Sequence, residues 1–272
     1  MRSRRRTYLD INYSQPVNWR NRLNAGLVSW WLTIPHWRGT QWRDLCNRNH
    51  GTLTNMDPAT DWVSARGRPG GFGCLEFVHS ASDEHVSVPT TTMLEVFSNP
   101  FTVSFWIKAP GTTSYEAIWS KSANIGINRN GTTGGLYFVM TGGSGVLSFS
   151  SPSVFDATWH HVLWTYTGDA STCYVDGKLA ATVARTGTPT GGGTTALGIG
   201  KGDGGNKDLT GLLDGFCLFN RGVTSSEAAA LYYESRLGNP STLNWISPVR
   251  YFDAGGGGGG GNPWHYYAQQ AG

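Results

Sequence analysis

Residues 158–182, TWHHVLWTYTGDASTCYVDGKLAAT, decide the fold of this chain. The stretch is rich in aromatic and β-branched residues, which favour strands. Neighbouring side chains of a strand point to opposite faces of a sheet, so His160 and His161 cannot converge on one metal ion or one substrate. Large apolar residues accompany each histidine on its own face. We therefore predict a central sandwich strand with packed histidines rather than an active site.

Asp176 and Gly177 interrupt the strand pattern in the second half of this stretch. An Asp-Gly pair between two strands is typical of a type I′ hairpin turn, in which both central residues have a positive φ. The pair predicts a hairpin between TCYV and KLAATV, and it makes Asp176 a turn residue rather than a catalytic acid.

Short strand patterns recur outside this hairpin. Residues 101–109, FTVSFWIKA, alternate strictly between two faces, and residues 74–80 and 85–89 are further strand candidates separated by a polar turn. Asn130-Gly131 is a candidate for another hairpin turn. Short strands that recur between turn residues predict an all-β sandwich or barrel.

One helix is predicted after the last strand, within VTSSEAAALYYESRLGNP. Thr224 followed three residues later by Glu227 matches a capping box at a helix start. Gly238 stands where a C-terminal cap is expected, and Pro240 follows it. We expect about three helical turns packed against an edge of the sheet.

Composition fits one β-sandwich domain with tails. The chain has 272 residues, of which 38 are glycine and 14% are charged, and its formal net charge is +3. Positive charge gathers at the front, where Arg4, Arg5 and Arg6 belong to a predicted basic arm over residues 1–25. No apolar segment follows this basic start, so we expect no Sec signal peptide, and no stretch is apolar for long enough to suggest a membrane span.

Residues 239–272 depart from the strand pattern and form a predicted aromatic and Gly-rich C-terminal arm. Seven consecutive glycines at 255–261 have no side chains to pack. The aromatic residues that we expect to anchor this arm on other protein subunits are Trp245, Tyr251, Phe252, Trp264, Tyr266 and Tyr267.

Four cysteines, Cys46, Cys74, Cys173 and Cys217, show no CxxC spacing. We expect them to be buried and reduced, although one or two disulfides could form and cannot be paired from sequence. A zinc site is not expected without closely spaced ligand pairs.

Several motifs in this order resemble the laminin-G-like jelly rolls of the concanavalin A-like lectin/glucanase superfamily. They are GLVSWW, RDLCNRNHGTLTN, GCLEFVHSASDEHVSVP, FTVSFWIKA, AIWSK, TWHHVLWTY with YVDGKL, and GLLDGFCLFNRGVTSSEAAALY. The resemblance covers roughly residues 26–235 and implies an antiparallel two-sheet jelly-roll sandwich over residues 26–238. Function does not follow from this fold.

The resemblance raises the question of glycoside hydrolysis, which the residues do not support. Glucanases of the superfamily carry carboxylates on one strand, spaced as Glu-x-Asp-x-Glu or with one extra residue, because retaining chemistry needs two carboxyl groups close together. No such spacing occurs here. We therefore predict that the protein is not an enzyme.

Two kinds of binding site remain as hypotheses. Relatives often hold calcium at the sandwich rim, and the candidate ligands here are Asp83, Asp203 and Asp214, although Lys201 and Lys207 oppose a cation. No other cofactor is expected. Aromatic residues in loop-like segments are candidates for stacking on glycans, namely Trp37, Trp42, Trp62 and Tyr115.

We expect a non-enzymatic structural or surface-display subunit of a larger assembly, most plausibly a phage or virus particle, as a decoration, capsid-associated or fibre protein. Its arms would contact other subunits in a homo-oligomer or lattice, and its rim would bind glycans. The alternative is a free or cell-surface carbohydrate-binding lectin, assisted by calcium. Both place the protein on a virion or an extracellular surface, and neither nucleic acid nor a membrane is an expected partner.

Overall fold

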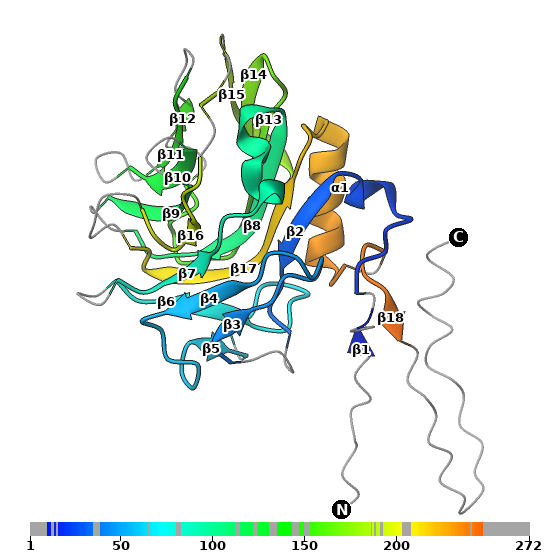
Figure 1. The fold of residues 1–272 in the computed structure, drawn as a ribbon, viewed down its shortest axis with the longest axis vertical. Helices are drawn as coiled ribbons and strands as arrows, with labels where there is room; N and C mark the ends of the chain where they lie inside the picture. The colour runs from blue at the N-terminus through cyan, green and yellow to red at the C-terminus, as the bar shows by residue number, and fades with distance from the viewer. Residues whose placement is uncertain are drawn as a thin grey trace, which may run out of the picture.

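The structure of the chain is a computed structural model. It describes residues 10–11, 14, 16–34, 39–64, 66–79, 83–111, 115–121, 125–130, 135–142, 147–149, 153–185, 187, 189–190, 193–202, 208–239 and 241–246. Two antiparallel sheets stack face to face, as the predicted jelly-roll sandwich requires (Figure 1).

The first sheet has the strand order β12-β11-β10-β9-β16-β7-β4-β3. Its strands, in chain order, are β3 (Gln41–Trp42), β4 (Gly51–Thr54), β7 (His85–Val88), β9 (Glu116–Lys121), β10 (Ile125–Arg129), β11 (Leu136–Met140), β12 (Leu147–Phe149) and β16 (Leu197–Ile199). β10 and β11 form a hairpin, but its connection runs from Asn130 to Gly135, which are joined by a backbone hydrogen bond of 2.8 Å. The loop is therefore longer than the two-residue turn predicted at Asn130-Gly131.

The second sheet has the order β15-β14-β13-β8-β17-β6-β5, and β2 also pairs with β17. Its strands are β2 (Leu27–Trp31), β5 (Trp62–Val63), β6 (Cys74–Phe77), β8 (Phe101–Lys108), β13 (His160–Tyr166), β14 (Ala170–Val175), β15 (Lys178–Ala184) and β17 (Gly211–Phe219). Two strands pair with the same side of β17: its first residues pair with β6 and its last residues pair with β2.

The quoted stretch forms β13, β14 and β15. β13 is an inner strand between β8 and β14, as predicted. Trp164 on one face belongs to the core between the sheets, and Leu163 on the other face packs beneath the C-terminal helix. Asp176 and Gly177 have φ values of 50° and 74°, which confirms the turn with two positive φ angles.

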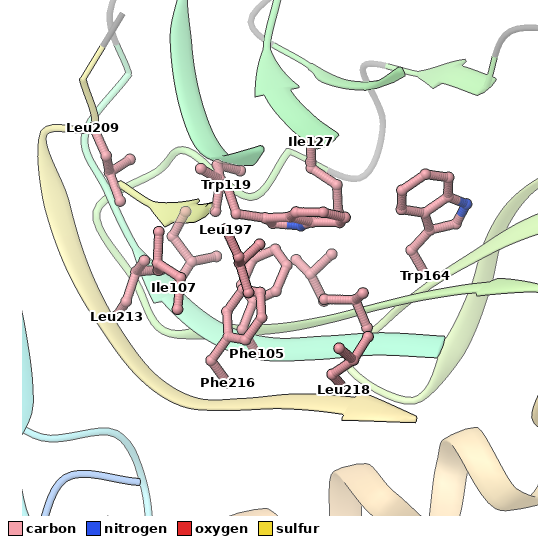
Figure 2. Packing of buried hydrophobic residues seen from close by; sticks show 14 of the residues in the cluster. Phe105, Ile107, Trp119, Ile127, Trp164, Leu197, Leu209, Leu213, Phe216 and Leu218 are labelled. Atoms are coloured by element: carbon pink, nitrogen blue, oxygen red, sulfur yellow. The ribbon is translucent and has the colours of Figure 1, made fainter. Parts of the chain in front are cut away.

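Aromatic rings fill the space between the two sheets (Figure 2). Phe105 of β8 and Phe216 of β17 stack with ring centroids 5.6 Å apart. Trp119 of β9, from the opposite sheet, meets Phe216 edge-on at 6.1 Å and also contacts Trp164 at 6.0 Å. These rings join the layers by the burial of large apolar surfaces.

The predicted helix is α1 (Ser225–Arg236), with Thr224 as N-cap and a capping box completed by Glu227. It contacts β15, the edge strand of the second sheet, as predicted. Tyr232 stacks on Trp106 of β8 at 5.7 Å and contacts His161 of β13 at 5.9 Å, so α1 covers the outer face of inner strands. The helix thus reaches further over the sheet than the predicted edge contact, because Leu163 and its neighbours make that outer face apolar and it needs a cover.

The two ends of the described chain pair with each other beside the sandwich (Figure 1). β1 (Asp10–Ile11) runs antiparallel to β18 (Trp245–Ile246). Val17 and Leu243 are buried in a second apolar cluster with Trp30, and Asn24 in the short 3-10 helix η1 (Arg22–Asn24) donates to the Thr242 carbonyl at 2.9 Å. Parts of both predicted arms thus pack onto the sandwich.

Among the described helices, none combines the length and the apolar character that a membrane crossing requires.

Candidate functional site

An open groove of about 480 Å³ lies between the start of β2, the 3-10 helix η2 (Thr92–Ser98) and the end of β17. Gly26 forms part of its wall with a φ of 73°, and a Cβ atom there would lie 2.7 Å from the Asn220 Oδ1 atom. Only glycine fits both the backbone and the space. The groove is lined by Gly26, Leu27, Val28, Arg48, Thr92, Met93, Glu95, Val96, Asn99 and Asn220.

Trp19 supplies an aromatic surface next to this groove. Its side chain is 51% exposed, and the guanidinium carbon of Arg48 lies 5.8 Å from the centre of its ring. The Trp19 segment is fixed from both sides, because the Asn18 backbone N–H donates to the Thr242 carbonyl at 2.9 Å and Asn21 Nδ2 donates to Ser241 Oγ at 2.8 Å. An exposed tryptophan is thus held by the paired chain ends.

Arg48 is placed by a buried carboxylate. Asp44, 1% exposed, accepts the backbone N–H groups of Trp30 at 2.8 Å, Arg48 at 3.2 Å and Asn49 at 3.0 Å. These bonds fold the loop after Asp44 against β2, and Asn47 takes a left-handed φ of 57° within it. A carboxylate that accepts several backbone N–H groups gives a loop a defined shape, so Arg48 reaches the Trp19 ring from a rigid base.

The polar groups around the groove suit a ligand with many hydroxyl groups. Arg48 offers fixed donors, while the exposed amides of Asn99 and Asn220 both donate and accept. The Glu95 carboxylate lies 3.4 Å from Lys121 Nζ. A few polar groups placed around an aromatic surface are typical of small-molecule binding sites.

The predicted stacking residues lie elsewhere. Trp42 and Trp62 are 1% and 4% exposed and meet edge-on at 6.5 Å, so neither ring offers a face to a sugar. Their polar sequence context was misleading, because the strands β3 and β5 turn both rings inward. Tyr115 is 47% exposed and keeps its candidacy, and Trp37 lies outside the described residues.

Trp19 was missed because it falls within the predicted N-terminal arm. The available signal was its polar surroundings, Asn18-Trp19-Arg20, a few residues before the first buried strand. The bond of its neighbour Asn18 to Ser241, at the far end of the described chain, has no local signature in sequence.

The histidine pair does not form a reactive site. His160 Nδ1 lies 2.8 Å from the Asp176 carboxylate and Nε2 lies 3.2 Å from that of Asp156. Burial alone lowers the pKa of His160, but its hydrogen bonds to Asp176 and Asp156 outweigh this and raise it. His161 points to the opposite face, where burial and the nearby Arg68 lower its pKa to about 3. The divergence predicted from strand alternation is confirmed.

The predicted calcium ligands are not brought together. Asp214 is 0% exposed and its Oδ2 atom lies 2.8 Å from Arg68 Nε, so it serves a buried ion pair rather than a metal at the rim. Asp203 lies outside the described residues. Asp83 is at the rim, but its Oδ2 atom bonds to the ammonium group of Lys201.

Asp208, which is not one of the predicted ligands, lies beside Asp83, and burial followed by that neighbouring carboxyl raises its pKa to about 6. Calcium prefers six to eight oxygen ligands. A rim that holds an ammonium group against one of its two carboxylates does not fit that preference. Within the described ranges, no three His, Cys, Asp or Glu side chains group as metal ligands do.

All four cysteines are free thiols, three of them buried. Burial raises the pKa of Cys74 to about 12, and burial also raises the pKa of Cys173. These thiols are therefore unreactive packing groups, as expected.

The arm residues Arg4, Arg5, Arg6, Tyr251, Phe252, Trp264, Tyr266 and Tyr267 lie outside the described residues. Trp245 is described through its backbone, which pairs with Ile11 in the β1–β18 ribbon.

Comparison with known proteins agrees with the fold. The binding domain of Paraclostridial Mosquitocidal Protein 1 superposes with a TM-score of 0.60 at 16% identity, over 79% of this chain and 53% of that chain. A mutant of HCR/D has a TM-score of 0.60 at 11% identity, over 79% and 54%. Trypanosoma rangeli sialidase in complex with sialic acid has a TM-score of 0.56 at 16% identity, over 79% and 34%.

The chain thus spans between about a third and a half of these solved chains, and at such identities the likeness concerns the fold. No curated protein matches the chain. A family model described as concanavalin A-like lectin/glucanases superfamily matches residues 80–229, which is more than half of the sequence. Together with the two-sheet architecture, this match shows that the chain belongs to the concanavalin A-like lectin/glucanase superfamily.

Proposed function

We propose that the protein is a non-enzymatic glycan-binding module whose sugar site is the groove between Trp19, Arg48 and Asn220. The observation that carries this proposal is the half-exposed Trp19 ring next to an open groove lined by both polar and apolar side chains. Solved structures of the same fold include a toxin binding domain and a sialidase with sialic acid, which makes carbohydrate binding a reasonable function for it.

Both apolar and polar contacts would contribute to binding of the sugar. The C–H face of a sugar ring packs on the open face of Trp19, where burial of apolar surface contributes most of the binding free energy. Ring hydroxyls and acidic substituents bond to Arg48, whose planar guanidinium suits carboxylates, and to the amides of Asn99 and Asn220. The rigid Asp44 loop limits the entropy that binding costs.

A glycan array identifies the ligand, and titration calorimetry then compares variants. Trp19→Ala and Arg48→Gln should each weaken the best ligand at least about tenfold. The matched control is Tyr233→Ala, which removes a 58% exposed aromatic ring on α1. Tyr115→Ala tests the other exposed candidate. Unchanged affinity in Trp19→Ala, or a loss only in Tyr115→Ala, contradicts the proposed site, and an empty array contradicts glycan binding.

We also propose that the module is displayed on a larger particle, a phage or virus, through its two terminal segments. This proposal is supported by the β1–β18 ribbon, which pairs the two segments that adjoin the basic and the aromatic ends in sequence. A free or cell-surface lectin is the alternative.

Light scattering of the full chain and of a variant trimmed to residues 10–246 tests the assembly proposal. The trimmed variant keeps every described hydrogen bond between the chain ends. We expect it to remain folded and to bind glycan but to lose assembly. Identical particle sizes for both proteins would favour the lectin.

A further inference from the structure

Three charged side chains meet at one rim of the sandwich, away from the Trp19 groove. Asp83 precedes β7, Lys201 follows β16, and Asp208 precedes β17. The Lys201 ammonium group bonds to Asp83 Oδ2. His85 also contacts this corner, with its Nδ1 atom 2.7 Å from the Asp83 carbonyl oxygen.

Asp208 is a buried carboxyl group, so this cluster needs a compensating positive charge or proton. The residue is 1% exposed, and apart from its contact with the Asp83 carboxyl group, neither of its carboxylate oxygens accepts a hydrogen bond from a donor within the described residues. Asp83 Oδ1 is likewise buried without such a donor. A buried carboxylate is stable only with a cation, a shared proton or several hydrogen bonds. Among the residues that the structure describes, the Lys201 ammonium group supplies a cation to this pair through its bond to Asp83.

We infer that Lys201 acts as the built-in cation of this rim: its ammonium group replaces a divalent metal ion beside Asp83 and Asp208. The wild-type rim is therefore independent of calcium. Replacement of Lys201 by a neutral side chain leaves two adjacent carboxylates with four oxygen atoms, which is a nucleus for a calcium site completed by backbone carbonyls and water. This inference is independent of the proposed glycan site.

Three features of this corner distinguish it from an ordinary surface ion pair. Lys201 is anchored through its own backbone, because its carbonyl accepts from Ser120 Oγ at 2.9 Å. Its Nζ atom bonds to the carboxylate that faces buried Asp208. Asp83 itself adopts a left-handed φ of 65°, so the backbone is bent to present this carboxylate to the corner.

The test is thermal unfolding of the full chain in about 5 mM CaCl₂, MgCl₂ or EDTA at matched ionic strength. Wild-type protein should show the same Tm in all three. Lys201→Met keeps the aliphatic stem, and it should have a lower Tm in EDTA and recover by about 2–4 °C with calcium but less with magnesium. The double variant Lys201→Met with Asp208→Asn should lose this calcium response.

Lys178→Met is the matched control, because Lys178 is an exposed lysine in β15, remote from the rim, and should show no calcium response. If Lys201→Met does not fold, Lys201→Gln serves in its place. The wild-type Tm in calcium and in EDTA tests calcium independence without either variant. A wild-type Tm that rises with calcium and falls with EDTA overturns the inference. The inference is also overturned if Lys201→Met or Lys201→Gln folds and its Tm does not change with calcium.

Discussion

Arg68 and Asp214 form an ion pair of 2.8 Å between Nε and Oδ2, and their side chains are 1% and 0% exposed. Asp214 also accepts the backbone N–H of Thr33 at 2.8 Å, while Arg68 bonds to the carbonyl of Ser235 in α1. The pair lies where β17 changes partner from β6 to β2. It therefore ties the split strand, the chain after β2 and the helix into one unit.

Loss of one member of this pair should be strongly destabilising. Asp214→Asn leaves a buried guanidinium group without its counter-charge, and we expect the free energy of unfolding to fall by about 3–5 kcal/mol. Denaturant unfolding measures the change. The control is Arg66→Met, which breaks the exposed pair with Glu76 and should cost less than about 1 kcal/mol. Similar costs for both variants would show that the buried pair has no special role.

His161 should make the protein sensitive to acid. Its pKa is lowered to about 3, so below the usual value of 6.5 the unfolded chain binds a proton that the folded chain does not. Stability is then lost as pH falls from about 6.5 towards 3, by on the order of 1 kcal/mol per pH unit. The groups that face His161 are Arg68, Trp106 and Tyr232.

His161→Phe fills the same aromatic site without a titratable group, and unfolding measured between pH 4 and 7 should show a shallower loss of stability. His160→Gln is the comparison. The pKa of His160 is raised, so it stabilises at low pH and this contribution disappears as pH rises through its folded pKa. Equal acid slopes in wild type and His161→Phe would contradict the assignment.

Ionisation of Asp208 should weaken the fold as pH rises from about 4 to about 6. Its folded pKa is raised to about 6 from 3.8, so its stabilising contribution is present below the lower value and is lost as pH rises through the higher one. Asp83, His79 and Lys201 are the charged groups that act on it. Asp208→Asn, which resembles the protonated acid, should raise the Tm at pH 8 but not at pH 4. A lower Tm at pH 8 would contradict this.

Leu243 should behave as a core residue although it follows the predicted domain boundary. It is 3% exposed in the cluster with Val17 and Trp30, so Leu243→Ala should lower the free energy of unfolding by about 2–4 kcal/mol. Leu237→Ala is the matched control, because that side chain is 71% exposed. If the two variants are equally stable, the chain ends do not pack as described.

Features that depend on neighbours in sequence could be predicted well. Strand alternation places His160 and His161 on opposite faces, and the Asp176-Gly177 pair selects its own turn. The capping box at Thr224 and Glu227 works in the same way, because its bonds span only three residues. In each case the backbone geometry of a few residues decides the outcome.

The candidate site depends on contacts that sequence distance hides. Trp42 and Trp62 resemble loop aromatics and are buried, whereas Trp19 resembles part of a loose arm and is presented at the surface by bonds to residues more than two hundred positions away. Burial is a property of the assembled sheets, so composition and spacing do not reveal which aromatic ring reaches solvent.

By itself, the sequence determined the all-β class, the histidine strand, its hairpin and the capped helix, since periodicity and turn chemistry act over a few residues. Only the tertiary structure decided that Arg68 pairs with Asp214, that Lys201 sits against Asp83, and that Val17 meets Leu243. Those contacts join segments that approach each other only after both sheets have stacked, because the cost of burying a charge or exposing a leucine is set by the completed fold.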